Sequence, residues 1–260
     1  MKQIILVLIG LGLGLNLAAQ SFSDSFYDAL NSDNLPQQRR ILAEWTAATP
    51  DDIDLYIARF NYYINYSMTL AESSAEASAL ADSGLAVIDR AIGLFPDRLD
   101  LRFGKIYFLG QTMQWQPFAD EILSTLDRSG AIGHRWQFPN FDQDGEVLIV
   151  EGVQDYLYTL FDAVQNAGQD GSTDIMPNIR RIAHRAAQLF PSEPSFLSAL
   201  AYTYIHDGDL PTALRHLNRA EQLAPTDRAV LQQLVDVHTR MKNKKMAAQY
   251  RARLDELQRP

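Results

Sequence analysis

The sequence contains one helix-ending pattern three times, and this pattern limits the chain to a helical architecture. An alanine precedes a proline by five positions and a leucine precedes it by two, in AIGLFPD, AAQLFPS and AEQLAPT, around Pro96, Pro191 and Pro225. A weaker copy, WTAATPD, surrounds Pro50. Proline cannot continue a helix, and the Asp, Ser or Thr after it can cap the next one. Each copy therefore predicts where one helix ends and another begins.

The spacing of apolar residues agrees with this interpretation. Leu231, Leu234 and Val235 follow one another at the three- and four-residue steps of an amphipathic helix, and no long stretch alternates apolar and polar residues as a half-buried strand would. Pro191 and Pro225 are 34 residues apart. The sequence therefore predicts an all-α fold of helix pairs, each pair closed by a proline turn.

The segment from Pro194 to Pro225 resembles a tetratricopeptide repeat, whose period is 34 residues. The matching positions are Leu197, Leu200, Ala201, Tyr204, Gly208, Ala213, Leu217, Ala220 and Pro225. Leu231, Leu234 and Ala247 belong to a final, looser unit. This resemblance implies a right-handed α-solenoid of about five or six helix pairs, with a concave face that holds a partner.

The resemblance also implies which side chains line that face. In the best repeat, residues 194–225, Tyr202, Ile205 and His206 lie on the side of the first helix that family members turn toward the groove. We expect Lys105 and Phe108 to occupy the corresponding places in an earlier first helix, around residues 101–110. We therefore expect these five residues to contact a protein or peptide partner.

The first nineteen residues form a separate module. Lys2 is its only charge, an apolar run covers residues 4–15, and Ala18 and Ala19 close it. This order is typical of a secretory signal peptide, and the run is shorter than the ~20 apolar residues of a membrane span. We expect cleavage before Gln20, a mature chain of residues 20–260 without a stable membrane span, and a periplasmic or secreted location.

Charge and composition narrow the classes of partner. The chain has a formal net charge of −9 and no cysteine. A nucleic-acid ligand is not expected, because phosphate binding needs a basic face. Residues 178–260 contain 13 basic residues (Lys and Arg) and 8 acidic residues (Asp and Glu). The residues before them contain 10 basic and 24 acidic residues. This basic end could steer a partner or favour head-to-tail contacts, or could simply be a solvated surface.

The stretch of residues 129–146 is the part that least resembles a repeat. Glycine, proline and aspartate indicate a loop insertion, while Trp136, Phe138 and Phe141 make it unusually apolar. A long ordered loop can be functional, or it can fold back and cover the end of the helical stack.

The same loop contains a pattern similar to an EF-hand calcium loop. Asn140, Asp142 and Asp144 alternate, Gly145 follows, and Glu151 comes six residues after that glycine. Alternate oxygen ligands, a glycine turn and a closing glutamate are what calcium requires. The other interpretation is an acidic cap on a helix that starts near residue 146. Calcium is the only cofactor that the sequence suggests.

No motif for catalysis stands out. The five histidines lack metal-ligand spacing, and the chain has no nucleophile elbow, phosphate loop or dinucleotide fingerprint. The aromatic run of Phe60, Tyr62, Tyr63 and Tyr66 could stack on a peptide or glycan, or could be helix-pair core. The sequence thus predicts a non-catalytic, exported scaffold. The alternatives are an exported enzyme or enzyme subunit with a site at residues 134–151, and a calcium-stabilised structural protein.

Overall fold

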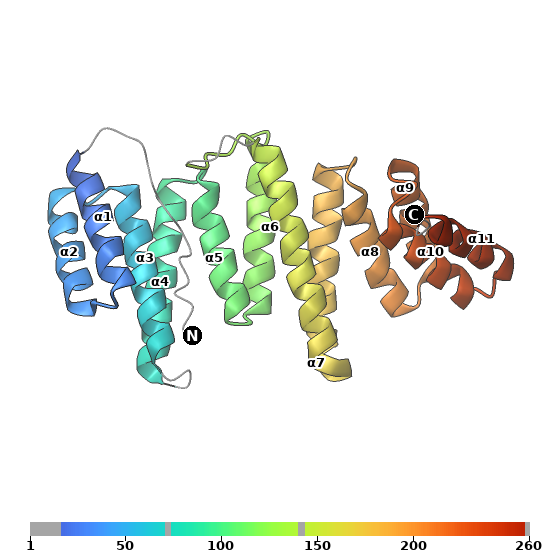
Figure 1. The fold of residues 1–260 in the computed structure, drawn as a ribbon, viewed down its shortest axis with the longest axis horizontal. Helices are drawn as coiled ribbons and strands as arrows, with labels where there is room; N and C mark the ends of the chain where they lie inside the picture. The colour runs from blue at the N-terminus through green and yellow to red at the C-terminus, as the bar shows by residue number, and fades with distance from the viewer. Residues whose placement is uncertain (1–16, 71–73, 140–143, 258–260) are drawn as a thin grey trace. The chain divides into compact units, whose positions relative to one another are not determined.

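A computed structural model describes residues 17–70, 74–139 and 144–257, and all its named elements are helices (Figure 1). The chain divides into two compact units, which are described separately. Residues 1–113 and 132–146 form unit 1, and residues 114–131 and 147–260 form unit 2. Unit 1 contains α1 (Leu17–Asn31), α2 (Leu35–Ala48), α3 (Ile53–Thr69), α4 (Ala75–Leu94) and α5 (Leu99–Gln111).

Unit 2 contains α6 (Trp115–Ala131), nearly all of α7 (Gly145–Leu189), α8 (Pro194–Asp207), α9 (Leu210–Leu223), α10 (Arg228–Arg240) and α11 (Lys244–Glu256). None of the helices within the described ranges is both long and apolar enough to cross a bilayer. The predicted signal peptide lies mostly outside these ranges, and the expected cut after Ala19 falls inside α1. Residues 129–131, expected to begin a loop, are the last turn of α6.

The helix endings lie where the repeated pattern predicts them. α2, α4, α7 and α9 each end two residues before their proline. In the three full copies the conserved spacing has one cause, because the residue before the proline donates its N–H to the carbonyl of Ala91, Ala186 or Ala220. Each of these alanines is fully buried. The leucine of the pattern is different, since Leu94 and Leu223 are 51% and 42% exposed and mark the helix end rather than the core.

A second kind of turn joins the two helices within a pair. At the end of α8, Gly208 has a φ of +80°, and the N–H of Asp209 reaches back to the carbonyl of Tyr204 at 2.9 Å. Asp209 then caps α9 by accepting the N–H of Thr212. The α10–α11 turn has the same form, with Lys242 at a φ of +59° followed by the capping residue Asn243. The α1–α2 turn repeats it with Asp33 and Asn34.

The core of unit 1 has two clusters built on α3. One packs α1 and α2 against α3 around Phe26 and Trp45, which are both fully buried. The other packs α3 against α4 and α5 around Phe60 and Phe108, whose rings meet edge to face at 6.3 Å. Helices α3 and α4 approach so closely at Gly84 that a Cβ there would lie 2.7 Å from Ile64. These contacts make unit 1 a stack of antiparallel helix pairs.

The segment after α6 returns to unit 1 and folds against the start of α5. Gln137 accepts the N–H of Leu99 at 3.0 Å and donates its own N–H to Asp97 at 2.8 Å. α5 has no side-chain N-cap, so this carbonyl satisfies a helix N–H that would otherwise lack an acceptor. Phe138 packs edge to face on Phe103. The described part of the loop thus covers one end of unit 1.

In unit 2, α7 must reverse direction between its first arm, residues 147–166, and its second arm, residues 175–189. Phe161 in the first arm packs on Tyr202 with ring centroids 5.0 Å apart, and Arg180 in the second arm donates to Thr203 at 3.0 Å. A straight helix would separate residues 161 and 180 by about 28 Å. Because Tyr202 and Thr203 are adjacent, both arms lie beside α8 (Figure 1).

The best tetratricopeptide-like repeat, α8 and α9, buries most of the apolar residues that the resemblance identifies. Ala201, Ala213, Leu217 and Ala220 are fully buried, and Leu197 is 5% exposed. They share one cluster with Leu231, Leu234 and Tyr250 from the following pair. The continuous core between neighbouring pairs is what a stacked repeat requires.

Candidate functional site

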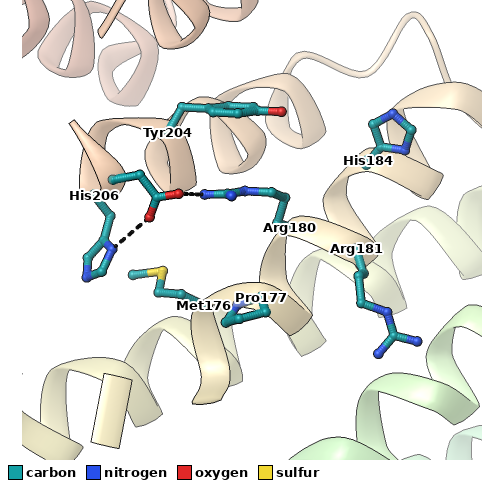
Figure 2. A pocket seen from close by; sticks show the side chains of 8 residues that line it. Met176, Pro177, Arg180, Arg181, His184, Tyr204 and His206 are labelled. Atoms are coloured by element: carbon teal, nitrogen blue, oxygen red, sulfur yellow. Dashed lines mark hydrogen bonds and ion pairs between the residues drawn. The ribbon is translucent and has the colours of Figure 1, made fainter. Parts of the chain in front are cut away.

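Unit 2 has two hollows that share His206, and together they are called the groove. The first hollow is about 500 Å³ and the second about 430 Å³. The first is lined by Met176, Pro177, Arg180, Arg181, His184, Tyr204, His206 and Asp207 (Figure 2). The second is lined by Tyr202, Ile205, His206, Gln232, Gln233, Asp236 and Arg240. The groove therefore involves the second arm of α7, the end of α8, and α10.

Arg180 is the most firmly held charged side chain of the first hollow. Its Nε donates to Thr203 Oγ1 at 3.0 Å, and its Nη2 donates to the Thr203 carbonyl at 2.8 Å and to Asp207 at 2.6 Å. The bond from Arg180, with a smaller contribution from His206, lowers the pKa of Asp207. A guanidinium fixed in this way loses little conformational entropy when a ligand binds.

Tyr204 forms a rigid wall of the first hollow. The Arg180 guanidinium lies over one face of its ring, 4.7 Å from the centroid (Figure 2). The imidazole of His216 stacks on the ring at 5.5 Å with an interplanar angle of 9°. Burial, with the nearby Arg215 charge, lowers the pKa of His216 and favours its neutral form. These stacking contacts hold the ring in place.

The second hollow contains an acceptor without a partner. Gln233 donates its Nε2 to Ser198 Oγ at 2.9 Å, which fixes the orientation of the amide. Within the described residues, its buried Oε1 accepts no hydrogen bond. On the rim, Arg240 pairs with Asp236 of the same helix at 3.0 Å. This oxygen is closed off from solvent, so a ligand in the hollow meets other atoms of the Gln233 side chain.

Of the residues expected to contact a partner, three lie at the groove and two do not. Tyr202 lines the second hollow and His206 lines both. Ile205 also borders the second hollow, but it is 5% exposed and belongs to the core of unit 2. Phe108 is 2% exposed and belongs to the core of unit 1, so it offers no surface to a partner. Lys105 forms an ion pair with Asp89 at 2.6 Å, and its side chain is 18% exposed.

The expected calcium ligands are only partly described. Asn140 and Asp142, like Phe141, lie outside the described residues. Asp144 accepts the N–H of Glu146 at 2.9 Å, as a helix cap does, and Glu151 lies on α7. Among the described residues no group of three or more His, Asp or Glu side chains could hold a metal ion. Calcium binding by this loop stays a prediction.

The aromatic run on α3 is partly core. Phe60 and Tyr62 are buried, and the Tyr62 hydroxyl accepts a hydrogen bond from Arg39 Nε at 2.5 Å. Tyr63 and Tyr66 pack on the same cluster and are half-buried. This arrangement favours the interpretation of these rings as helix-pair packing.

The groove also contains residues that the sequence reasoning did not single out. On α7 they are Arg180, Arg181 and His184, and on α10 they are Gln233 and Arg240. Both sets follow the three- and four-residue steps of one helix face. A search for polar stripes opposite the apolar stripe of each helix would have found them.

No known protein-family model matches the sequence, and no curated protein sequence is similar to it. Several solved structures resemble the fold. They include PilW, described as a widely conserved type IV pilus biogenesis factor, at 12% identity and a TM-score of 0.41, with 93% of this chain and 94% of that chain covered.

Two further structures have comparable coverage. A MamA RS-1 double mutant is 15% identical with a TM-score of 0.33, over 94% of this chain and 96% of that one. The assembly chaperone of RpL4, Acl4, is 15% identical with a TM-score of 0.38, over 92% and 98%. The helix pairs, their turns and their shared core give this chain an all-α, tetratricopeptide-like helical repeat fold.

Proposed function

We propose that the protein is a non-catalytic scaffold that binds an extended segment of a protein partner in the groove of unit 2. The observation that supports this is the pair of hollows that share His206 in their lining and include side chains held in fixed positions. A groove longer than a single pocket suits an extended chain, and fixed side chains reduce the entropy lost on binding.

The position of the groove supports the same function. Its lining side chains come from helices of successive pairs, so the spacing of the repeats sets the spacing of the contacts. Tyr202 and His206 are one helical turn apart on α8 and are half-buried and exposed, respectively. Both can contact a ligand while buried α8 side chains, such as Leu197 and Ala201, keep their core contacts.

A co-precipitation experiment tests this proposal. The bait is the chain from Gln20, and the test variant is Tyr202→Ala/His206→Ala. The matched control is Gln222→Ala/Gln249→Ala, which removes two exposed side chains of α9 and α11 outside the groove lining. All three proteins should show the same helicity by circular dichroism.

We expect the bait and the control variant to retain the same protein from an envelope extract, and the test variant to lose it. Equal capture by the test variant would show that the partner binds elsewhere and would contradict the proposal.

We also propose that the protein is exported. The support is the N-terminal module of one lysine, an apolar run and two alanines, which is the arrangement that secretion signals have. The expected result is a protein in the envelope or the medium whose first residue, by N-terminal sequencing, is Gln20. A protein in the cytoplasm that retains Met1 or Lys2 would contradict export.

A further inference from the structure

We infer that the groove selects an extended segment with an acidic side chain, whose carboxylate enters the first hollow. This inference rests on the proposed function and specifies the chemistry of the partner. The ligand is a peptide segment with an internal Asp or Glu.

The unused hydrogen-bonding groups of the first hollow support a carboxylate. A guanidinium has five N–H donors. Arg180 uses its Nε and Nη2 on Thr203 and Asp207, and within the described residues its Nη1 has no acceptor. His184 is exposed and forms no hydrogen bond within the same residues. The one carboxylate of the hollow, Asp207, is already bound by Arg180 and His206. The hollow therefore has donors to offer, and its one carboxylate is already bound.

Arg181 adds a second cation at the edge of this hollow. It pairs with Asp120 at 2.9 Å, and the two side chains are 47% and 52% exposed. An exposed pair of this kind is weak and can rearrange when a competing carboxylate arrives. Figure 2 shows Arg180 and Arg181 extending from α7 in different directions, so they border the first hollow on different sides.

The second hollow gives the rest of an extended ligand a place to bind. His206 lines both hollows, and Tyr202 and Arg240 line the second one. A segment whose acidic side chain enters the first hollow can therefore continue past His206 toward the second.

The charge distribution of the chain favours the same ligand. Residues 178–260 hold 13 basic and 8 acidic side chains in a protein whose overall charge is −9. An acidic segment is therefore attracted to this part of the molecule and repelled from the rest. A basic segment would be drawn away from the groove.

Fluorescence anisotropy with the full chain tests the inference. The probe is a labelled twelve-residue peptide of alternating Ser and Asp, acetylated and amidated so that no terminal carboxylate is present. The comparison peptides replace Asp by Asn or by Lys. We expect the Asp peptide to bind at least about tenfold more tightly than the Asn peptide.

Two variants separate the groove from general electrostatics. Arg181→Gln/His184→Gln should bring the affinity for the Asp peptide to within about threefold of the Asn peptide. The control Arg228→Gln/Arg251→Gln removes two exposed cations that do not line the groove, and it should leave that ratio unchanged.

Each other outcome has a definite meaning. If the Asn or Lys peptide binds as tightly as the Asp peptide and Tyr202→Ala/His206→Ala abolishes that binding, the acidic preference is overturned and the groove function survives. If the control variant lowers the Asp affinity as much as the test variant does, the preference is general electrostatics and the inference fails. If none of the peptides binds, the inference fails, and the co-precipitation with Tyr202→Ala/His206→Ala decides the proposed function separately.

Discussion

Arg180 and Asp207 form an ion pair at 2.6 Å between the second arm of α7 and the end of α8. The pair fixes the donor side of the first hollow, because the same guanidinium also binds the backbone carbonyl of Thr203. Asp207 has a lowered pKa chiefly because of the hydrogen bond from Arg180. The interaction therefore stabilises the fold when Asp207 is ionised and loses this effect as pH falls through the lowered pKa.

Asp207→Asn tests this pair. Its partners are 32% and 46% exposed, so we expect the loss in unfolding free energy at pH 7 to be below about 1 kcal/mol. The difference between variant and wild type should shrink in urea titrations as pH falls through the lowered pKa of Asp207, where its carboxylate becomes protonated. Removing a negative charge from the first hollow should also tighten binding of the Ser-Asp peptide. Weaker binding would mean that the position in which Asp207 holds Arg180 matters more to the ligand than the negative charge of Asp207.

The contribution of Asp54, in unit 1, to the stability of the fold has the opposite pH dependence. Burial, and the neighbouring Asp52 and Asp100 carboxylates, raise its pKa to about 6. A raised carboxyl pKa means that the folded state binds the proton more tightly, so stability falls as pH rises from about 4 to about 6. Asp54→Asn should therefore stabilise unit 1 by about 1–2 kcal/mol at pH 7, after allowance for partial exposure.

The gain from Asp54→Asn should disappear near pH 4, which thermal unfolding at the two pH values will show. Asp52→Asn is the matched control. Asp52 caps α3 and accepts the Trp45 Nε1–H at 3.0 Å, so Asp52→Asn should lower the free energy of unfolding at pH 7. A stabilising effect of Asp54→Asn that persists unchanged at pH 4 would show that the effect does not come from ionisation.

The within-pair turns predict opposite effects for two substitutions. Gly208 has a positive φ, and a Cβ added there would meet no atom within 4 Å. Gly208→Ala should therefore lower the free energy of unfolding by about 1 kcal/mol, through backbone conformation alone. Lys242 has a φ of +59° at the corresponding place, so Lys242→Gly should stabilise by up to about 1 kcal/mol. Urea unfolding measures both. Two changes of the same sign would contradict the shared turn geometry.

The return of the loop to unit 1 depends on a glycine. A Cβ on Gly145 would lie 2.4 Å from the carbonyl oxygen of His134, so Gly145→Ala must displace this part of the loop. We expect a loss of about 1–3 kcal/mol. Gly93→Ala, within α4, meets no atom within 4 Å and should stabilise by about 0.5–1 kcal/mol. Calorimetry that found Gly145→Ala neutral would show that the loop does not need this close approach.

The sequence predicts the helix-pair fold because its main signals are local. The alanine and proline spacing marks helix ends through one hydrogen bond and one steric rule, and both operate within six residues. The Gly208 turn and the buried alanines of α8 and α9 follow from the same repeat. The Lys242 turn is harder to predict, because nothing in lysine itself favours a positive φ.

The groove could be predicted only in part, because its geometry depends on contacts between helices. Tyr202 and His206 follow from repeat register, since they lie on one face of α8. Arg180 reaches the groove because α7 reverses direction, and no local sequence pattern predicts that reversal. Analogy with the best repeat places Phe108 at the groove. Its ring instead packs in the core of unit 1, so positions in one repeat do not predict the orientation of side chains in a divergent one.

Hydrogen–deuterium exchange of the protein alone and with its captured partner tests the central claim most directly. We predict slower exchange, on partner binding, in residues 176–184, 202–207 and 232–240, which line the two hollows. The outer helices α9 and α11 should exchange at unchanged rates. Protection centred on unit 1 or on the segment after α6, with none in these three stretches, would contradict the assignment of the groove as the binding site.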